Sequence, residues 1–97
     1  MIYINAAGFE TAVGATKPTF VLFAGRWSAP GNTVAAKLMG LDLTKVSVYQ
    51  VDLDSSDGAH LAMSLSIREA PTVILFVTGV PKLRAQDLTD EMIKMVS

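Results

Sequence analysis

The sequence contains no cysteine among its 97 residues. This absence excludes disulfide bonds, thiolate catalysis, iron–sulfur clusters and cysteine-ligated zinc. The chain also lacks any apolar run long enough to span a bilayer, and its N-terminus MIYINAAGFE has neither a basic start nor a signal-type apolar stretch. We therefore expect a cytoplasmic protein that works without thiol chemistry and without a membrane partner.

Charge is sparse as well. Only 18% of the residues are charged, and the eight Lys and Arg residues nearly balance the nine Asp and Glu residues, for a net charge of -1. No basic cluster is present, so direct binding to nucleic acid is not expected. Hydrophobic residues make up 51% of the chain, which predicts one compact domain over residues 1–97 with a large core.

The apolar pattern predicts strands that alternate with helices. Runs rich in β-branched and aromatic residues predict strands at Ile2–Asn5, Thr19–Phe23, Val46–Leu53, Thr72–Val77 and Lys82–Ala85. Apolar residues at helical spacing predict helices within Phe9–Thr16, Ala29–Met39, Ala59–Ile67 and Leu88–Val96. Because the segment TFVLF is almost continuously apolar, we expect it to form the central strand, buried on both faces.

The expected helix boundaries follow from capping residues. Ser28 is placed to cap the second helix, with Pro30 in the first turn and Gly40 as the stop, and Asp87 is expected to cap the last helix. Four methionines fall on the predicted inward faces of helices, where we expect them to fill gaps in the core: Met39, Met63, Met92 and Met95.

A Trp-x-x-Pro turn opens the second helix, and a proline, Pro71, stands just before the fourth strand. With this order of elements, the chain resembles the thioredoxin family over nearly its whole length. The resemblance implies an α/β fold with a central mixed sheet, made of three parallel-type strands and an antiparallel C-terminal hairpin, flanked by helices. It also implies a cis peptide bond between Ala70 and Pro71, ahead of Thr72; such a bond is energetically accessible only before proline.

The chain departs from that family at the residues that carry out its redox chemistry. Thioredoxins read Trp-Cys-Gly-Pro-Cys in this turn, whereas here the residues are Trp27, Ser28, Ala29, Pro30 and Gly31. The buried aspartate that the family usually carries five residues before the tryptophan is replaced by leucine, and the proline in the middle of the second helix is absent. We interpret the chain as a redox-inactive member that is not an enzyme.

Two chemical alternatives rest on single residues. Ser28 as a nucleophile needs a neighbouring base, but the only histidine, His60, falls on the third helix. A metal site is the second alternative, with Asp54, Asp57 and His60 as its ligands. Their spacing is not a recognised ligand pattern, however, and aspartates at the start of a helix are common caps. We expect no catalytic residue, no metal and no cofactor.

The resemblance implies a docking surface for another protein or an extended peptide segment. The residues expected to form it are Trp27, Ser28, Ala29, Pro30, Gly31, Ala70, Pro71 and Thr72. We expect the tryptophan to be half-buried beside the turn. Members of the family serve as non-catalytic accessory subunits, including for a viral replication polymerase. By this precedent, we expect an accessory or structural protein of a phage or a bacterium.

Other interpretations remain open at this point. Ser28 at a helix N-terminus could bind glutathione or another thiol, as some glutathione transferases do, but their usual second domain does not fit in this length. An engineered cysteine-free thioredoxin is disfavoured by Leu22 and Gly31, because cysteine removal would use serine or alanine and keep the aspartate. The predicted edge strand Lys82–Ala85 could support sheet extension or dimerisation, and the oligomeric state is left open.

Overall fold

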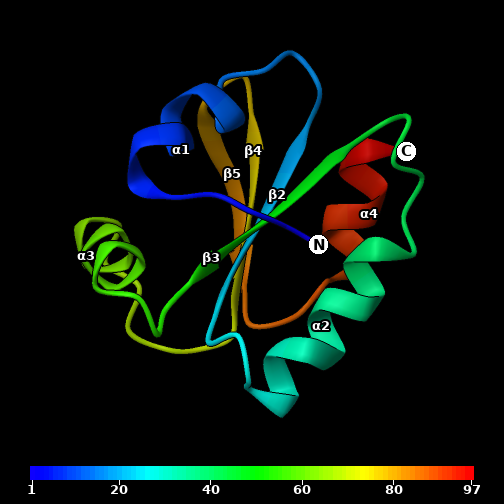
Figure 1. Ribbon diagram of the computed structural model, residues 1–97. Helices are drawn as coiled ribbons and strands as arrows, with labels where there is room; N and C mark the ends of the chain where they lie inside the picture. Colours follow the sequence, from blue (N-terminus) through cyan, green and yellow to red (C-terminus); the bar gives the residue numbers. More distant parts are fainter.

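A computed structural model describes all 97 residues (Figure 1). The elements follow one another as β1 (Ile2–Tyr3), α1 (Ala6–Val13), β2 (Thr19–Ala24), α2 (Ala29–Met39), β3 (Ser47–Asp52), α3 (Ser56–Ser64), β4 (Thr72–Val77), β5 (Val80–Ala85) and α4 (Asp90–Val96). Every helix and strand that the sequence predicts is present, with shifted boundaries in several cases.

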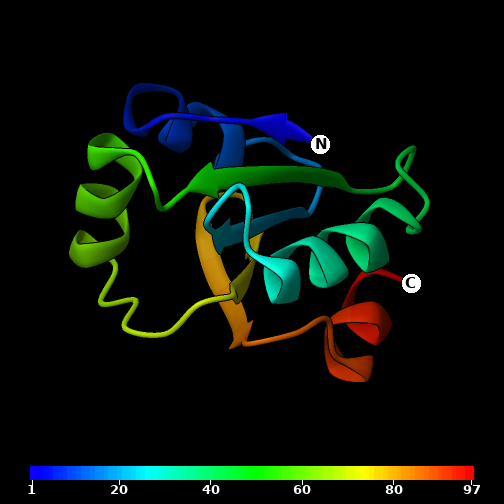
Figure 2. The same cartoon turned by 60° about the horizontal axis from the view of Figure 1, so that its bottom comes forward.

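The strands form one mixed sheet in the order β1-β3-β2-β4-β5. β1, β3 and β2 run parallel, whereas β4 is antiparallel to β2 and forms a hairpin with β5. Helices α1 and α3 cover one face of the sheet, and α2 and α4 cover the other (Figures 1 and 2). This is the arrangement of three parallel strands plus an antiparallel hairpin that the sequence predicts.

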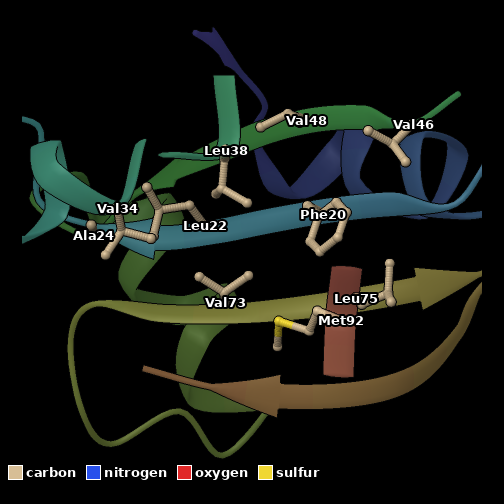
Figure 3. Packing of buried hydrophobic residues seen from close by; sticks show 10 residues of the cluster. All are labelled: Phe20, Leu22, Ala24, Val34, Leu38, Val46, Val48, Val73, Leu75 and Met92. Atoms are coloured by element: carbon tan, nitrogen blue, oxygen red, sulfur yellow. The ribbon is translucent and has the colours of Figure 1, made fainter. Parts of the chain in front are cut away.

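The core has two halves, one on each face of β2. Phe20 and Leu22 point to the side of α2 and α4, where Leu38 and Met92 are fully buried against them (Figure 3). On the other face, the ring of Phe9 meets the ring of Phe76 edge-on, with 5.5 Å between ring centroids. Every residue of β2 is buried, which confirms Thr19–Phe23 as the central strand.

Two helices begin earlier than the sequence pattern indicates. α1 starts at Ala6, because the side chain of Asn5 accepts a hydrogen bond from the Gly8 N–H at 2.9 Å. α3 starts at Ser56, because the Ser55 hydroxyl accepts one from the Gly58 N–H, also at 2.9 Å. The segment SSDG, residues 55–58, therefore supplies the cap and the first turn of α3.

The cap of α4 is Thr89 and not Asp87. The Thr89 hydroxyl accepts a hydrogen bond from the Met92 N–H at 3.2 Å. The carboxylate of Asp87 instead meets the Lys37 ammonium of α2 at 2.8 Å and accepts a hydrogen bond from the Leu88 N–H. The expected cap was wrong because a long-range ion pair, invisible to a local pattern, holds the aspartate.

The expectation that four methionines fill the core is wrong for three of them. Met92 is fully buried, but Met39, Met63 and Met95 are between 41% and 74% exposed. Met95 lies on the same helix as Met92, so a residue at helical spacing from a core position can still face solvent. The side chains of these three methionines therefore form part of the protein surface and not of the core.

Candidate functional site

The two segments of the expected docking surface lie at the same edge of the sheet. The turn with Trp27 follows the carboxyl end of β2, and the loop with Ala70 and Pro71 precedes the amino end of β4. β2 and β4 are antiparallel neighbours in which Phe23 pairs with Thr72, so the end of one strand lies beside the start of the other. Figure 1 shows both segments at the lower end of the sheet.

Ser28 caps α2, as predicted. Its hydroxyl oxygen accepts a hydrogen bond from the Gly31 N–H at 3.2 Å, and its carbonyl accepts one from the Asn32 N–H at 2.9 Å. No side chain that could serve as a base is hydrogen-bonded to this hydroxyl, and His60 is exposed on α3. Ser28 therefore caps the helix, and no base is placed to activate its hydroxyl as a nucleophile.

Gly31, in the first turn of α2, is buried. A Cβ atom at this position would lie 2.7 Å from the Cβ of Ala24, closer than such atoms approach in proteins. Leu22 is fully buried in the core cluster with Ala24 and Leu38. Both residues are thus accommodated by packing, and a side chain at residue 31 would require the strand or helix to move.

Trp27 does not pack beside the turn. Its side chain is 84% exposed, so the expectation of a half-buried ring was wrong. The adjacent Arg26 faces the protein instead: its guanidinium lies 4.2 Å from the centroid of the Tyr3 ring and 3.7 Å from the Asp52 carboxylate. Because Arg26 takes the inward contacts, the neighbouring tryptophan projects into solvent, where Ala29 and Pro30 are exposed too.

The peptide bond between Ala70 and Pro71 is cis. Ala70 is exposed, Pro71 is partly buried and Thr72 is buried, with its hydroxyl donating to the carbonyl of Glu69 at 2.6 Å. Neither the N–H nor the carbonyl of Ala70 makes a hydrogen bond within the chain. Both backbone groups of this residue are therefore free to pair with another chain.

The surface hollows include only part of the expected docking surface. None of the surface hollows is lined by Trp27. A hollow of about 230 Å³ does lie beside Ala70, and Met63 and Ile67 are among its mostly apolar lining residues. The sequence assigned Met63 to the core, so α3 was missed as a wall of this surface; nothing in the periodicity distinguished the two roles.

The acidic residues near the start of α3 serve local structure. The Asp57 carboxylate accepts a hydrogen bond from the Ala6 N–H at 2.7 Å and so joins α3 to α1. Asp54 lies against Gly25, where its carboxylate oxygen would be 2.9 Å from an added Cβ. No three His, Asp or Glu side chains are grouped closely enough to hold a metal ion. The helices are also too short or too polar for any to traverse a bilayer.

Comparison with known proteins gives a clear result for the fold alone. No family model matches the chain, and no curated protein matches it in sequence. Among solved structures, thioredoxin f2 from Chlamydomonas reinhardtii superposes with a TM-score of 0.80 and 20% identity over 99% of this chain and 93% of that one.

The chain has the thioredoxin fold. Thioredoxin from Fasciola hepatica superposes with a TM-score of 0.79 and 21% identity, over 98% of this chain and 94% of the other. Thioredoxin O2 from Arabidopsis thaliana in its oxidized state gives 0.76 and 22%, with coverages of 98% and 89%. Because this chain has no cysteine, its version of the thioredoxin fold carries no dithiol.

Proposed function

We propose that this protein is a redox-inactive accessory or structural module that binds an extended segment of another protein through the Trp27 turn and the Ala70-Pro71 loop. The observation that carries the proposal is the 84% exposure of Trp27, at the sheet edge where the backbone of Ala70 is unpaired. Aromatic side chains, and tryptophan in particular, are enriched at protein interfaces relative to the rest of the surface, which favours a partner at this position.

The two features suit one mode of recognition. An extended peptide gains affinity by pairing with free backbone groups and gains specificity through side-chain contacts. Ala70 offers the backbone N–H and carbonyl, and Trp27 offers the kind of aromatic side chain that dominates binding energy at interfaces. Ala29 and Pro30 add exposed, uncharged surface that is easily desolvated.

The proposal includes no enzymatic step. Ser28 uses its hydroxyl oxygen to cap α2, and no base reaches it, so acyl or group transfer at this residue has no proton acceptor. No cofactor is part of the proposed role, and the cytoplasmic location expected from the sequence stays a prediction.

Trp27 is the only tryptophan, so its fluorescence reports directly on this surface. We would select peptides from a random peptide display library on the unaltered protein and titrate the best of them. Docking at the proposed surface should shift the Trp27 emission to the blue and protect the ring from acrylamide quenching. Amide chemical shifts in ¹⁵N spectra should change at Trp27–Gly31 and Ala70–Thr72.

Two variants and a control make the result decisive. Trp27→Ala should weaken the selected peptide by about 2 kcal/mol or more, as loss of an aromatic anchor does. Ala70→Arg should also weaken it, by obstructing the backbone pairing. The control is Val80→Ala, which trims another exposed apolar side chain, 49% accessible, at the β4–β5 turn and far from the site in the sheet register. Peptides whose binding is unchanged by all three variants would refute the proposed surface.

A titration with glutathione distinguishes the thiol-binding alternative from the protein-docking proposal. If Ser28 holds a thiol ligand, amide shifts at Ser28–Asn32 should saturate and Ser28→Ala should abolish them. We expect no saturable change, because Ser28 lines none of the hollows on the surface of the structure. Saturation that depends on Ser28 would replace the protein-docking proposal with a thiol-binding one.

A further inference from the structure

The end of the molecule away from the Trp27 turn carries its own group of exposed apolar side chains. Ile2, Met39 and Leu43 are 64%, 41% and 42% exposed, and they line a hollow of about 210 Å³. A second hollow of about 240 Å³ includes Ile93 of α4 and shares Val46 with the first. We call the exposed side chains Ile2, Met39, Leu43 and Ile93 the distal patch.

The distal patch is separate from the docking surface proposed above. It lies where α2 ends and β3 begins, and the first residue of β3, Ser47, pairs with the first residue of β2, Thr19. The Trp27 turn follows the opposite end of β2. Figures 1 and 2 place the N-terminus, the segment between α2 and β3, and the end of α4 toward the same side of the molecule.

The hollows of the distal patch have a basic rim. Lys17 lines the first hollow and Lys45 lines the second, and neither forms a salt bridge. The Lys17 ammonium instead donates to the carbonyl of Leu43 at 3.2 Å, which holds the charge beside the apolar side chains. The one carboxylate lining the hollows, Asp42, accepts hydrogen bonds from the hydroxyl and the N–H of Thr44, at 2.6 and 3.0 Å.

These neighbours also fix the charge state of Asp42. The hydrogen bonds from Thr44 lower the pKa of its carboxyl most, and the nearby charges of Lys45 and Lys17 lower it further. Asp42 is thus ionised, and the side chains that line the two hollows carry two positive charges, on Lys17 and Lys45, and this one negative charge. The distal patch therefore combines apolar hollows with a local excess of positive charge.

We propose that the distal patch binds an acidic amphipathic helix of a partner protein. Its apolar side chains would enter the two hollows and its carboxylates would pair with Lys17 and Lys45, which is the charge complementarity that selects partners. A helix fits better than a strand, because β1 already covers part of the β3 edge, with Ile2 paired to Tyr49. The flexible side chain of Met39 adapts to the anchor it meets.

The test uses two synthetic helical peptides about four turns long, with the same leucine face and either glutamates or lysines on the polar face. Each is titrated into the ¹⁵N-labelled full chain. We expect shifts at Ile2 and across 39–48, with the glutamate peptide binding about tenfold tighter than the lysine peptide at low salt. The preference should shrink as salt is added.

Charge reversal provides the matched variant. The double change Lys17→Glu and Lys45→Glu alters two exposed side chains, and its fold can be checked by circular dichroism. We expect this variant to prefer the lysine peptide. Leu43→Ser should weaken both peptides, and Trp27→Ala should leave both affinities unchanged, because the inference does not rest on the function proposed for the Trp27 turn.

Several outcomes would overturn the inference. Equal affinity for the two peptides would show that the lysines do not select the partner. Chemical shift changes confined to Trp27–Gly31 and Ala70–Thr72 would show that the peptides bind at the other surface. Absence of binding to either peptide also rejects it. A concentration-dependent dimer in sedimentation experiments, lost in Leu43→Ser, would show that a second copy of the chain occupies the distal patch instead.

Discussion

At the scale of single residues, the packing at the start of α2 depends on Gly31 and on its neighbours in β2. The space that a side chain at residue 31 would need is occupied by Ala24 of the neighbouring strand. Leu22 belongs to the same apolar cluster as Ala24. The first position thus leaves no room for a larger side chain, and the second lies among apolar residues.

Gly31→Ala should destabilise the protein. Alanine is favoured over glycine in helices by up to about 1 kcal/mol, but forcing a methyl group against Ala24 costs about 1–3 kcal/mol. Because the contact would be only 2.7 Å, we expect the packing cost to exceed the propensity gain. Urea unfolding of Gly31→Ala beside the exposed-site control Asn32→Ala measures this, and a more stable Gly31→Ala variant would contradict it.

Placing an acid at residue 22 should destabilise the protein more than truncating the side chain. Leu22→Ala should cost about 3–5 kcal/mol for the cavity it leaves. Leu22→Asp also buries an unpaired charge, so we expect a larger loss at pH 7. Burial raises the pKa of the introduced carboxyl in the folded state, so the additional penalty should shrink as the pH falls toward about 4. Unfolding curves of both variants at several pH values test the order and its pH dependence.

At the scale of elements, the loop that presents Ala70 is held by a side chain of β5. The Arg84 guanidinium donates to the carbonyl of Leu65 at 2.9 Å and to that of Ser66 at 2.8 Å, at the end of α3. Ser66 adopts a left-handed backbone conformation, with φ of 58°. Such contacts satisfy the last carbonyls of a helix. They also attach α3 to β5, on which Pro81 and Lys82 are typical guards against edge pairing.

Arg84→Ala should loosen this loop. Two hydrogen bonds from a charged, exposed donor are lost, and we expect a destabilisation of about 1–2 kcal/mol. Amide hydrogen exchange should accelerate most between Ser66 and Ala70. The control is Lys82→Ala on the same strand, which makes no such contacts. Uniform acceleration across the sheet, or none in the loop, would argue against the proposed anchoring.

The ion pair between α2 and the segment before α4 gives a pH-dependent prediction. The hydrogen bond from Lys37 is the main cause that lowers the pKa of Asp87 from its ordinary value of 3.8. A carboxyl group whose pKa is lower in the folded than in the unfolded state stabilises the protein at pH values above its unfolded-state pKa. This stabilisation is lost as the pH falls through the folded-state pKa. Both side chains are about half exposed, so Asp87→Asn should cost at most about 1 kcal/mol at pH 7.

The difference in stability between the unaltered protein and Asp87→Asn should therefore disappear as the pH falls below 3.8. Chemical denaturation at pH 7 and in steps between pH 5 and about 2.5 measures the closing gap. A gap that persists in acid would assign the effect to the hydrogen bond with the Leu88 N–H and not to the ion pair.

At the scale of the whole molecule, one sheet joins two cores that do not touch each other. Phe9 belongs to the cluster under α1 and α3, and Leu38 to the cluster under α2. Because β2 contributes alternate residues to both clusters, loss of either should weaken the whole domain.

Phe9→Ala and Leu38→Ala should each destabilise the protein by about 3–5 kcal/mol. Each variant should still unfold in one transition, monitored by far-ultraviolet circular dichroism and by hydrogen exchange of β2 and β4. Trp27 is unsuited as a folding probe, because its side chain is already 84% exposed in the native state. A biphasic transition in either variant would show that the two faces fold separately.

Much of the architecture could be predicted from the sequence. The apolar run of β2 predicted a central buried strand, and the spacing around Trp27 and Pro71 indicated the fold that the solved thioredoxins share. Local rules also placed Ser28 correctly, because capping depends on atoms three residues apart. The boundaries of α1, α3 and α4 were less accurate, because caps compete with contacts from elsewhere, as Asp87 shows.

The sequence by itself thus determined the order of elements, the central strand, the absence of thiol chemistry and the residues that approach each other at the edge of the sheet. Only the tertiary structure decided which apolar residues remain exposed. Helical spacing predicts an inward position for Met39, Met63 and Met92 alike, yet Met92 is fully buried in the core cluster, whereas Met39 and Met63 are 41% and 74% exposed. Periodicity identifies a face of a helix, but burial requires a second element to cover it.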